Sequence, residues 1–184
     1  CISALLRENH IEYIKWDMNR ALSDVYSHSL APERQGEVSH LYVLGVYDLM
    51  NRLTRDFPDV LFEGCAGGGG RFDPGILYYS PQIWCSDDTD PIERIPIQYG
   101  TSFGYPVSTM GAHVSASPNH QTGRVIPLKF RFDVAMTGRL GMEMKPSDLN
   151  EREREYAKKA VAFYKEIRPI IQLGDQYRLL SPYE

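Results

Sequence analysis

The segment IEYIKWD at residues 11–17 decides the fold class. Its apolar and aromatic side chains are typical of a strand, and the strand ends on a charged residue. Similar short runs recur at residues 60–63, 82–86, 111–114 and 141–143, separated by amphipathic stretches of helical period. This alternation predicts an α/β chain of about five βα units.

Polar residues follow the predicted strands at the points where the strands end. They are Asp17, Cys65, Asp87 and His113. In (β/α)8 barrels the active site is built from the C-terminal ends of the strands, so this placement favours part of such a barrel. A complete barrel needs about 250 residues, and a doubly wound sheet also fits the alternation.

The composition is that of an ordinary globular protein. The chain has 184 residues, of which 42% are hydrophobic and 24% are charged, enough for one domain with a core. The net charge of −4 and the scattered basic residues argue against nucleic acid or a membrane surface as a partner. No apolar run is long enough to cross a bilayer, so we expect no membrane span.

The cysteines and the first residues bear on the cellular context. Cys1, Cys65 and Cys85 form no CxxC pair and no even framework, which favours reduced thiols and a cytoplasmic protein. The chain starts without Met, on a segment that reads as the middle of a helix and has no signal-peptide pattern. We therefore expect it to be part of a longer protein.

The strand that ends at Asp17 carries the first candidate catalytic group. Side chains alternate along a strand, so Lys15, Asp17 and Asn19 should share one face, and Trp16 should point to the other. A nearby ammonium keeps a carboxylate ionised, which suits a nucleophile or an electrostatic stabiliser. From the spacing alone, a surface Lys–Asp ion pair is the simpler interpretation.

Three acids, Asp87, Asp88 and Asp90, form the second candidate cluster. Crowding of like charges raises the pKa of at least one carboxyl group, as a general acid near neutral pH requires. Asp90 precedes Pro91, a favoured first helical residue, so we expect Asp90 to cap the next helix. A divalent-cation loop is the other interpretation, but the EF-hand spacing and its glycine are absent.

The glycine run at residues 67–70 does not match a phosphate-binding loop, because Arg71 and not a Lys-Ser/Thr pair follows it. It predicts a loop whose backbone closely approaches a ligand or another loop. His113 and His120 lack the spacing of metal ligands and fit structural roles better, so we expect no metal.

Three motifs together resemble the family 36 glycoside hydrolases, the microbial α-galactosidases. The first is KWDMNR at residues 15–20, which is similar to the nucleophile motif of that family. The second is CSD at residues 85–87 followed by Asp90 and Arg94, which resembles the acid/base motif. The third is FEGCA at residues 62–66 with the glycine run and Arg71, which resembles the block that lines the galactose pocket.

The resemblance implies a retaining mechanism on a galactoside. Asp17 would be the nucleophile and Asp87 the acid/base, with no cofactor and no metal. Lys15 and Asn19 would hydrogen-bond sugar hydroxyls, and Cys65 and Gly68 would pack close to the ring. Trp16 and Met18, inside the first motif, would complete the set of substrate-binding residues.

The resemblance also implies that residues 1–184 are only part of one catalytic (β/α)8 barrel, about its last four to five βα units. The first strands, an N-terminal β-sandwich and a C-terminal β-domain would be absent. The substrate would be a terminal α-linked galactose of an oligosaccharide such as raffinose or melibiose, and the parent protein would be a homo-oligomer. We expect this chain alone to be inactive. A galactosyl transferase using the same aspartates and a non-catalytic carbohydrate-binding relic are the alternatives.

Overall fold

The computed structural model describes residues 2–19 and 23–184. The chain forms two compact units, Cys1–Pro81 and Gln82–Glu184, and each is described by itself. Among the described residues, no helix combines the length and the apolar character needed to cross a membrane.

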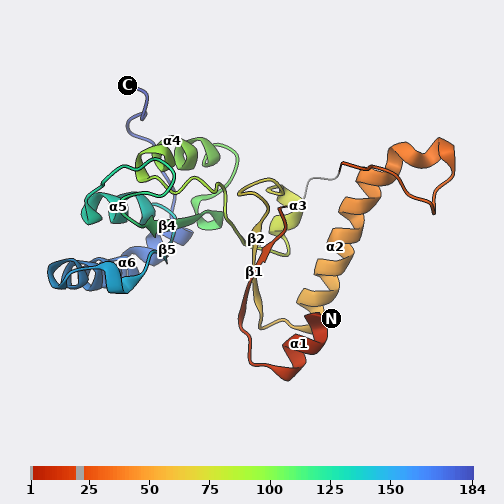
Figure 1. Cartoon of the computed structure of the whole chain (residues 1–184), viewed down its shortest axis with the longest axis horizontal. Helices are drawn as coiled ribbons and strands as arrows, with labels where there is room; N and C mark the ends of the chain where they lie inside the picture. The colour runs from red at the N-terminus through yellow and green to blue at the C-terminus, as the bar shows by residue number, and fades with distance from the viewer. Residues whose placement is uncertain (1, 20–22) are drawn as a thin grey trace. The chain divides into compact units, whose positions relative to one another are not determined.

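The first unit contains two parallel strands and three α-helices among its described residues (Figure 1). Strands β1 and β2 pair in register from Tyr13 opposite Leu61 to Asp17 opposite Cys65. In chain order the elements are α1 (Ile2–Glu8), β1 (Tyr13–Asp17), the 3-10 helix η1 (Pro32–Glu37), α2 (Val38–Asp56), β2 (Leu61–Cys65) and α3 (Pro74–Leu77).

The first unit buries apolar side chains from both its helices and its strands. Met50 and Leu53 on α2 and Phe62 on β2 are almost fully buried. On the other face of the strands, Tyr13 and Leu61 at the strand starts are 45% and 39% exposed, whereas Glu63 and Cys65 are buried.

The second unit repeats the alternation of parallel strands and helices. Strands β4 and β5 are parallel, from Gly111 opposite Arg139 to Ser115 opposite Glu143, and Ile83 forms a parallel bridge with Met110. The elements are β3 (Gln82–Ile83), α4 (Pro91–Thr101), η2 (Val107–Thr109), β4 (Gly111–Ser115), α5 (Leu128–Ala135), β5 (Arg139–Glu143), η3 (Pro146–Asp148) and α6 (Glu151–Leu173).

Helices α5 and α6 build the core of the second unit together with β4. Val114, Phe132 and Ala135 are at most 1% exposed, and Leu149, Ala157 and Ala160 join them in one cluster. The ring of Tyr156 on α6 meets that of Phe132 edge to face. Burial of this apolar surface holds the helices on the sheet.

The start of the last helix differs from the sequence-based expectation. The last helix starts at Glu151 and is capped by Asn150, whose side chain forms a capping box with Glu153. The sequence predicts that residues 146–151 open this helix, with Ser147, Asn150 and Glu151 as its cap region, but residues 146–148 form the separate turn η3. A capping box satisfies two orphan amide groups at once, which explains why Asn150 is the stronger start signal.

The expected strand at residues 82–86 covers only Gln82 and Ile83, and the short helix α3 was not predicted. Parallel strands alternate with helices throughout the described residues, so the α/β class is confirmed.

Candidate active site

Asp17 ends β1 and lies on the expected face of the strand. Along β1 the side chains alternate between exposed and half-buried, and Lys15 and Asp17 are on the exposed side. The side-chain amide of Asn19 donates to a carboxylate oxygen of Asp17 at 3.3 Å. The prediction that Lys15, Asp17 and Asn19 lie on one side of the strand therefore agrees with the structure.

Lys15 has an ionic partner that the sequence did not indicate. Its Nζ lies 3.8 Å from Oε1 of Glu63, which is opposite Lys15 in the parallel ladder. Glu63 is only 2% exposed. The side chain of Glu63 is fixed by burial, so its contact with Nζ restrains the position of Lys15.

The glycine loop is tied to the end of β1. The amide of Gly67 donates to Oδ1 of Asn19, so Asn19 links the Asp17 carboxylate to this loop. Gly67 and Gly68 have φ values of 55° and 72°, in the left-handed region that favours glycine. The close approach predicted for the glycine run is thus realised as a tight turn beside Asn19.

Cys65 lies opposite Asp17 at the end of β2 and is buried. Burial raises the pKa of its thiol to about 11, and the neighbouring Asp17 carboxylate acts in the same direction. The thiol is therefore neutral at physiological pH and presents a soft, weakly polar surface beside Asp17.

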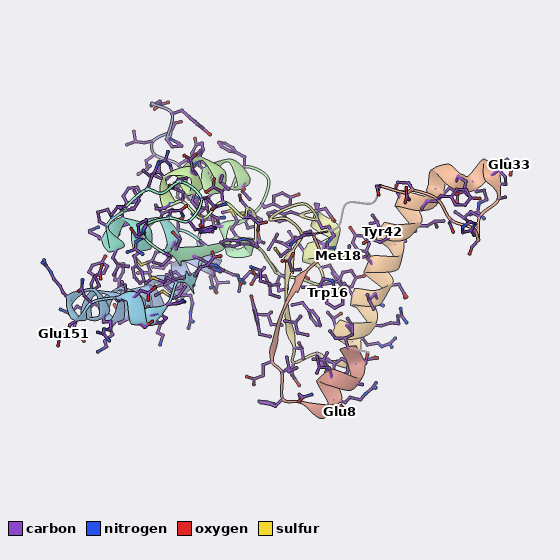
Figure 2. All side chains as sticks on the ribbon, viewed as in Figure 1. Glu8, Trp16, Met18, Glu33, Tyr42 and Glu151 are labelled. Carbon is purple, nitrogen blue, oxygen red and sulfur yellow. The ribbon has the colours of Figure 1, made fainter. Side chains whose placement is uncertain are left out.

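Trp16 and Met18 contact residues that are not among those predicted for the site (Figure 2). The Trp16 ring lies 6.5 Å from the Phe62 ring, on the strand face opposite Asp17. The hydroxyl of Tyr42 on α2 donates to Sδ of Met18 at 3.7 Å. Sugar contacts by Trp16 and Met18 stay predictions, and Arg20 of the same motif lies outside the described residues.

In the second unit, Asp87 follows β3 in an irregular turn and is exposed. The turn leads into α4, and Oδ1 of Asp90 accepts the amides of Ile92 and Glu93 at 2.8 and 3.4 Å. The predicted cap is thus confirmed. Burial acts to raise the pKa of Asp90, but the hydrogen bonds from Thr122 and the helix amides outweigh it and lower the pKa. Crowding of acids was expected to raise at least one pKa in this cluster, and the pKa of Asp90 is lowered.

Arg94 of the second motif is buried and anchors the residues before Asp87. It donates to the carbonyl oxygens of Ser86 at 3.0 Å and Gly111 at 2.7 Å, and it lies over the ring of Trp84. His113 stacks on the same Trp84, with ring centroids 4.2 Å apart. This packing agrees with the structural role predicted for His113, but His113 lies within β4 and not after its end as expected.

Among residues 2–19 and 23–184, no cluster of three or more His, Cys, Asp or Glu side chains is arranged to hold a metal ion. The described part of the first unit brings together Lys15, Asp17, Asn19, Cys65 and Gly68, five of the eight residues predicted for the site. Sequence reasoning missed Glu63 in this unit and Gln121, which contacts the Asp87 turn in the second unit.

The model of the Melibiase family matches residues 1–174. The chain belongs to the melibiase family. Among the relatives of this melibiase segment, α-galactosidase AgaA of Geobacillus stearothermophilus is 56% identical over 183 residues, which are 100% of this chain and 25% of the relative. Alpha-galactosidase 1 of Pediococcus pentosaceus is 56% identical over 98% of this chain and 25% of its own length.

Solved structures of melibiases superpose on the chain closely. The crystal structure of the GH36 α-galactosidase AgaA from Geobacillus stearothermophilus has a TM-score of 0.96 at 55% identity, over 99% of this chain and 25% of that one. The galactosidase domain of the α-galactosidase–sucrose kinase AgaSK has a TM-score of 0.92 at 52% identity, over 100% of this chain and 24% of that one. The melibiase segment thus spans about a quarter of the length of these proteins.

Proposed function

We propose that this segment supplies both catalytic carboxylates of a retaining α-galactosidase that removes terminal α-linked galactose from oligosaccharides such as raffinose or melibiose. One observation carries the proposal: Asp17 ends a strand beside Lys15, Asn19 and Cys65, within a chain that is 56% identical to an α-galactosidase over 183 residues. Crystal structures of AgaA variants have been solved with raffinose and with stachyose, which supports the substrate class.

In the proposed first step, the Asp17 carboxylate attacks the anomeric carbon of galactose, and the bond from that carbon to the leaving oxygen breaks. Asp87 gives its proton to the leaving oxygen. The product of this step is a galactosyl ester of Asp17. Lys15 and Asn19 would hold sugar hydroxyls, while Gly68 and Cys65 would allow the ring to approach the backbone closely.

In the second step, Asp87 removes a proton from water, and the water oxygen attacks the anomeric carbon and releases Asp17. Two inversions give net retention. This mechanism calls for carboxyl groups about 5–5.5 Å apart in the full-length enzyme. It uses no metal and no redox cofactor.

The same proposal includes the architecture. The parallel βα units would be about the last four to five of a (β/α)8 barrel, and residues 1–184 would be one incomplete catalytic domain. The full-length protein would be a homo-oligomer in the cytoplasm. The 184-residue chain by itself should lack activity, because the missing strands would supply the rest of the sugar pocket, and sugar positioning contributes on the order of 7–11 kcal/mol.

Transfer of galactose to a second sugar is the competing activity, because both activities share the galactosyl ester and differ in the acceptor. The test uses a full-length enzyme that contains this segment and an aryl α-galactoside. Proton NMR should detect α-galactose as the first product, with water as the main acceptor even when free sugar is present. A first product in the β configuration would refute the mechanism, whereas a dominant disaccharide product would identify a transferase.

The D17N variant is the control for this assay. It should show no turnover, since no ester can form. Galactose binding without turnover by the wild-type protein would instead support a carbohydrate-binding relic.

A further inference from the structure

The side chain of Gln121, in the loop between β4 and α5, bridges two backbone groups of the turn that carries Asp87. Its Oε1 accepts the Thr89 amide at 2.8 Å and the Thr89 hydroxyl at 3.1 Å. Its Nε2 donates to the carbonyl oxygen of Asp87 at 3.0 Å. Both ends of the Gln121 amide are therefore used to fix the peptide geometry on either side of Asp88.

Asn119, which is only 3% exposed, shapes the loop so that Gln121 can reach the turn. Its Oδ1 accepts the amides of Gln121 at 2.9 Å and Thr122 at 3.1 Å. Its Nδ2 donates to the hydroxyl of Thr89 at 3.0 Å. Buried polar groups with satisfied hydrogen bonds restrict the conformations of their surroundings, so Asn119 orders the loop from within.

The same loop also contacts the far end of the turn. The hydroxyl of Thr122 donates to Oδ2 of Asp90, and Arg124 lies 3.2 Å from Oδ1 of Asp90 and 2.7 Å from Glu93. Residues 119–124, here named the clamp loop, thus hold the turn at Asp87, Thr89 and Asp90. Within the clamp loop, and among the described residues, Gln121 is the only residue whose side chain forms a hydrogen bond with the backbone of Asp87.

Asp87 itself is exposed, and the backbone that carries it sets the region that its carboxylate can reach. A general acid must lie within hydrogen-bond distance of the leaving oxygen, and a shift of about 1 Å can cost about 100-fold in rate. We propose that Gln121 is a positioning residue for proton transfer by Asp87. This inference rests on the proposed function, in which Asp87 is the acid/base.

The experiment uses a full-length enzyme and a series of aryl α-galactosides whose leaving phenols differ in acidity. Q121M removes the donor and the acceptor at similar volume, and Q121E keeps the length but loses the donor to Asp87. R124Q is the matched control, because Arg124 belongs to the clamp loop but contacts Asp90 and Glu93. D87N is the reference, and thermal unfolding verifies that each variant is folded.

We expect kcat/KM of Q121M and Q121E to fall by about 10- to 100-fold for the least acidic phenols and by less than about 3-fold for the most acidic ones. A good leaving group needs little protonation, so a displaced acid matters least there. R124Q should change kcat/KM only slightly, and by the same factor for every aryl α-galactoside.

Two results would overturn the inference in distinguishable ways. In the first, kcat/KM of Q121M and Q121E falls by the same factor for all phenols, while kcat/KM of D87N depends steeply on phenol acidity. Gln121 would then be merely structural, and the proposed function would stay intact. In the second, kcat/KM of D87N does not depend on the acidity of the leaving phenol. Asp87 would then not be the acid, and the inference would fail together with that assignment.

Discussion

Asp17 and Asp87 are held in place by different means. Asp17 ends a strand that pairs with β2 over five residues, and its carboxylate accepts a hydrogen bond from Asn19, two residues beyond the strand. Asp87 follows the two-residue strand β3 in an irregular turn, where a loop from elsewhere in the chain binds the backbone. A proposed nucleophile on a regular ladder can be rigid, whereas a proposed acid/base on a clamped turn depends on side-chain hydrogen bonds.

Replacing the two aspartates in a full-length enzyme gives the largest expected effect. D17N should lower kcat for an activated aryl α-galactoside by roughly 10⁴-fold or more, the scale known for loss of a catalytic nucleophile or base. D87N should cost far less with this substrate but about 10²–10⁴-fold with raffinose. Steady-state kinetics on both substrates measures the contrast, and equal losses in D87N on both would contradict it.

The reactivity of Cys65 reports how well the β1–β2 ladder is closed at the end that carries Asp17. Because the pKa of its thiol is about 11, only about one thiol in a thousand is ionised at pH 8. Alkylation by iodoacetamide at pH 7 should therefore be roughly 300-fold slower than for an ordinary exposed cysteine of pKa about 8.5, and it should accelerate as the pH approaches 11. Peptide mapping by mass spectrometry measures the rate, and fast labelling at pH 7 would show that this strand end opens.

A substitution of Asp90 measures how much its contacts stabilise the turn that carries Asp87. D90N keeps a capping side chain but loses the charge that binds Arg124, so local stability should fall by about 1–2 kcal/mol. Hydrogen exchange of the Ile92 and Glu93 amides should then be roughly 5- to 30-fold faster at pH 7. D133N, which breaks only the surface pair with Lys129, should leave these amides unchanged.

The pH dependence of the same measurement has a defined sign. The pKa of Asp90 is lower in the folded protein, so its contribution is present above the unfolded value and is lost as the pH falls through the folded value. The difference between wild type and D90N should therefore shrink below about pH 4. A difference that stays constant down to pH 2 would mean that the Asp90 charge is unimportant.

The smallest effect concerns Lys15 and Glu63. Lys15 is 37% exposed, so solvent weakens its attraction to Glu63, and we expect a coupling of about 1 kcal/mol. E63Q should raise KM about 5-fold in a wild-type background and leave KM unchanged in a K15M background. Independent effects in this double-mutant cycle would contradict the proposed support of Lys15, and E12Q, at an exposed position, is the control.

The sequence was sufficient where a signal is local. Alternating side chains predicted the shared face of Lys15 and Asp17, and the Asp90–Pro91 pair predicted the start of α4. The apolar residues after Ile83 suggested a longer strand, but Trp84 contacts Arg94 and His113. These contacts come from other elements, so no local pattern reveals them.

Long-range polar contacts explain what was missed at the site. Gln121 reaches Asp87 across 34 positions, and Glu63 meets Lys15 only because β1 and β2 pair in one register. A glutamine in a polar loop and a glutamate before a glycine carry no distinguishing pattern of their own. The short helix α3 was missed because its start signal, Asp73 followed by Pro74, precedes only four helical residues.

The pairing of His113 with Gly141 limits what protein engineering can change in this segment. Gly141 lies directly opposite His113 in the β4–β5 ladder, and a Cβ atom there would overlap the imidazole that stacks on Trp84. A library that randomises β5 should therefore strongly favour glycine at position 141 as long as His113 is kept. Variation at 141 becomes accessible only after a smaller residue replaces His113, so the order of the two mutations decides which evolutionary routes are open.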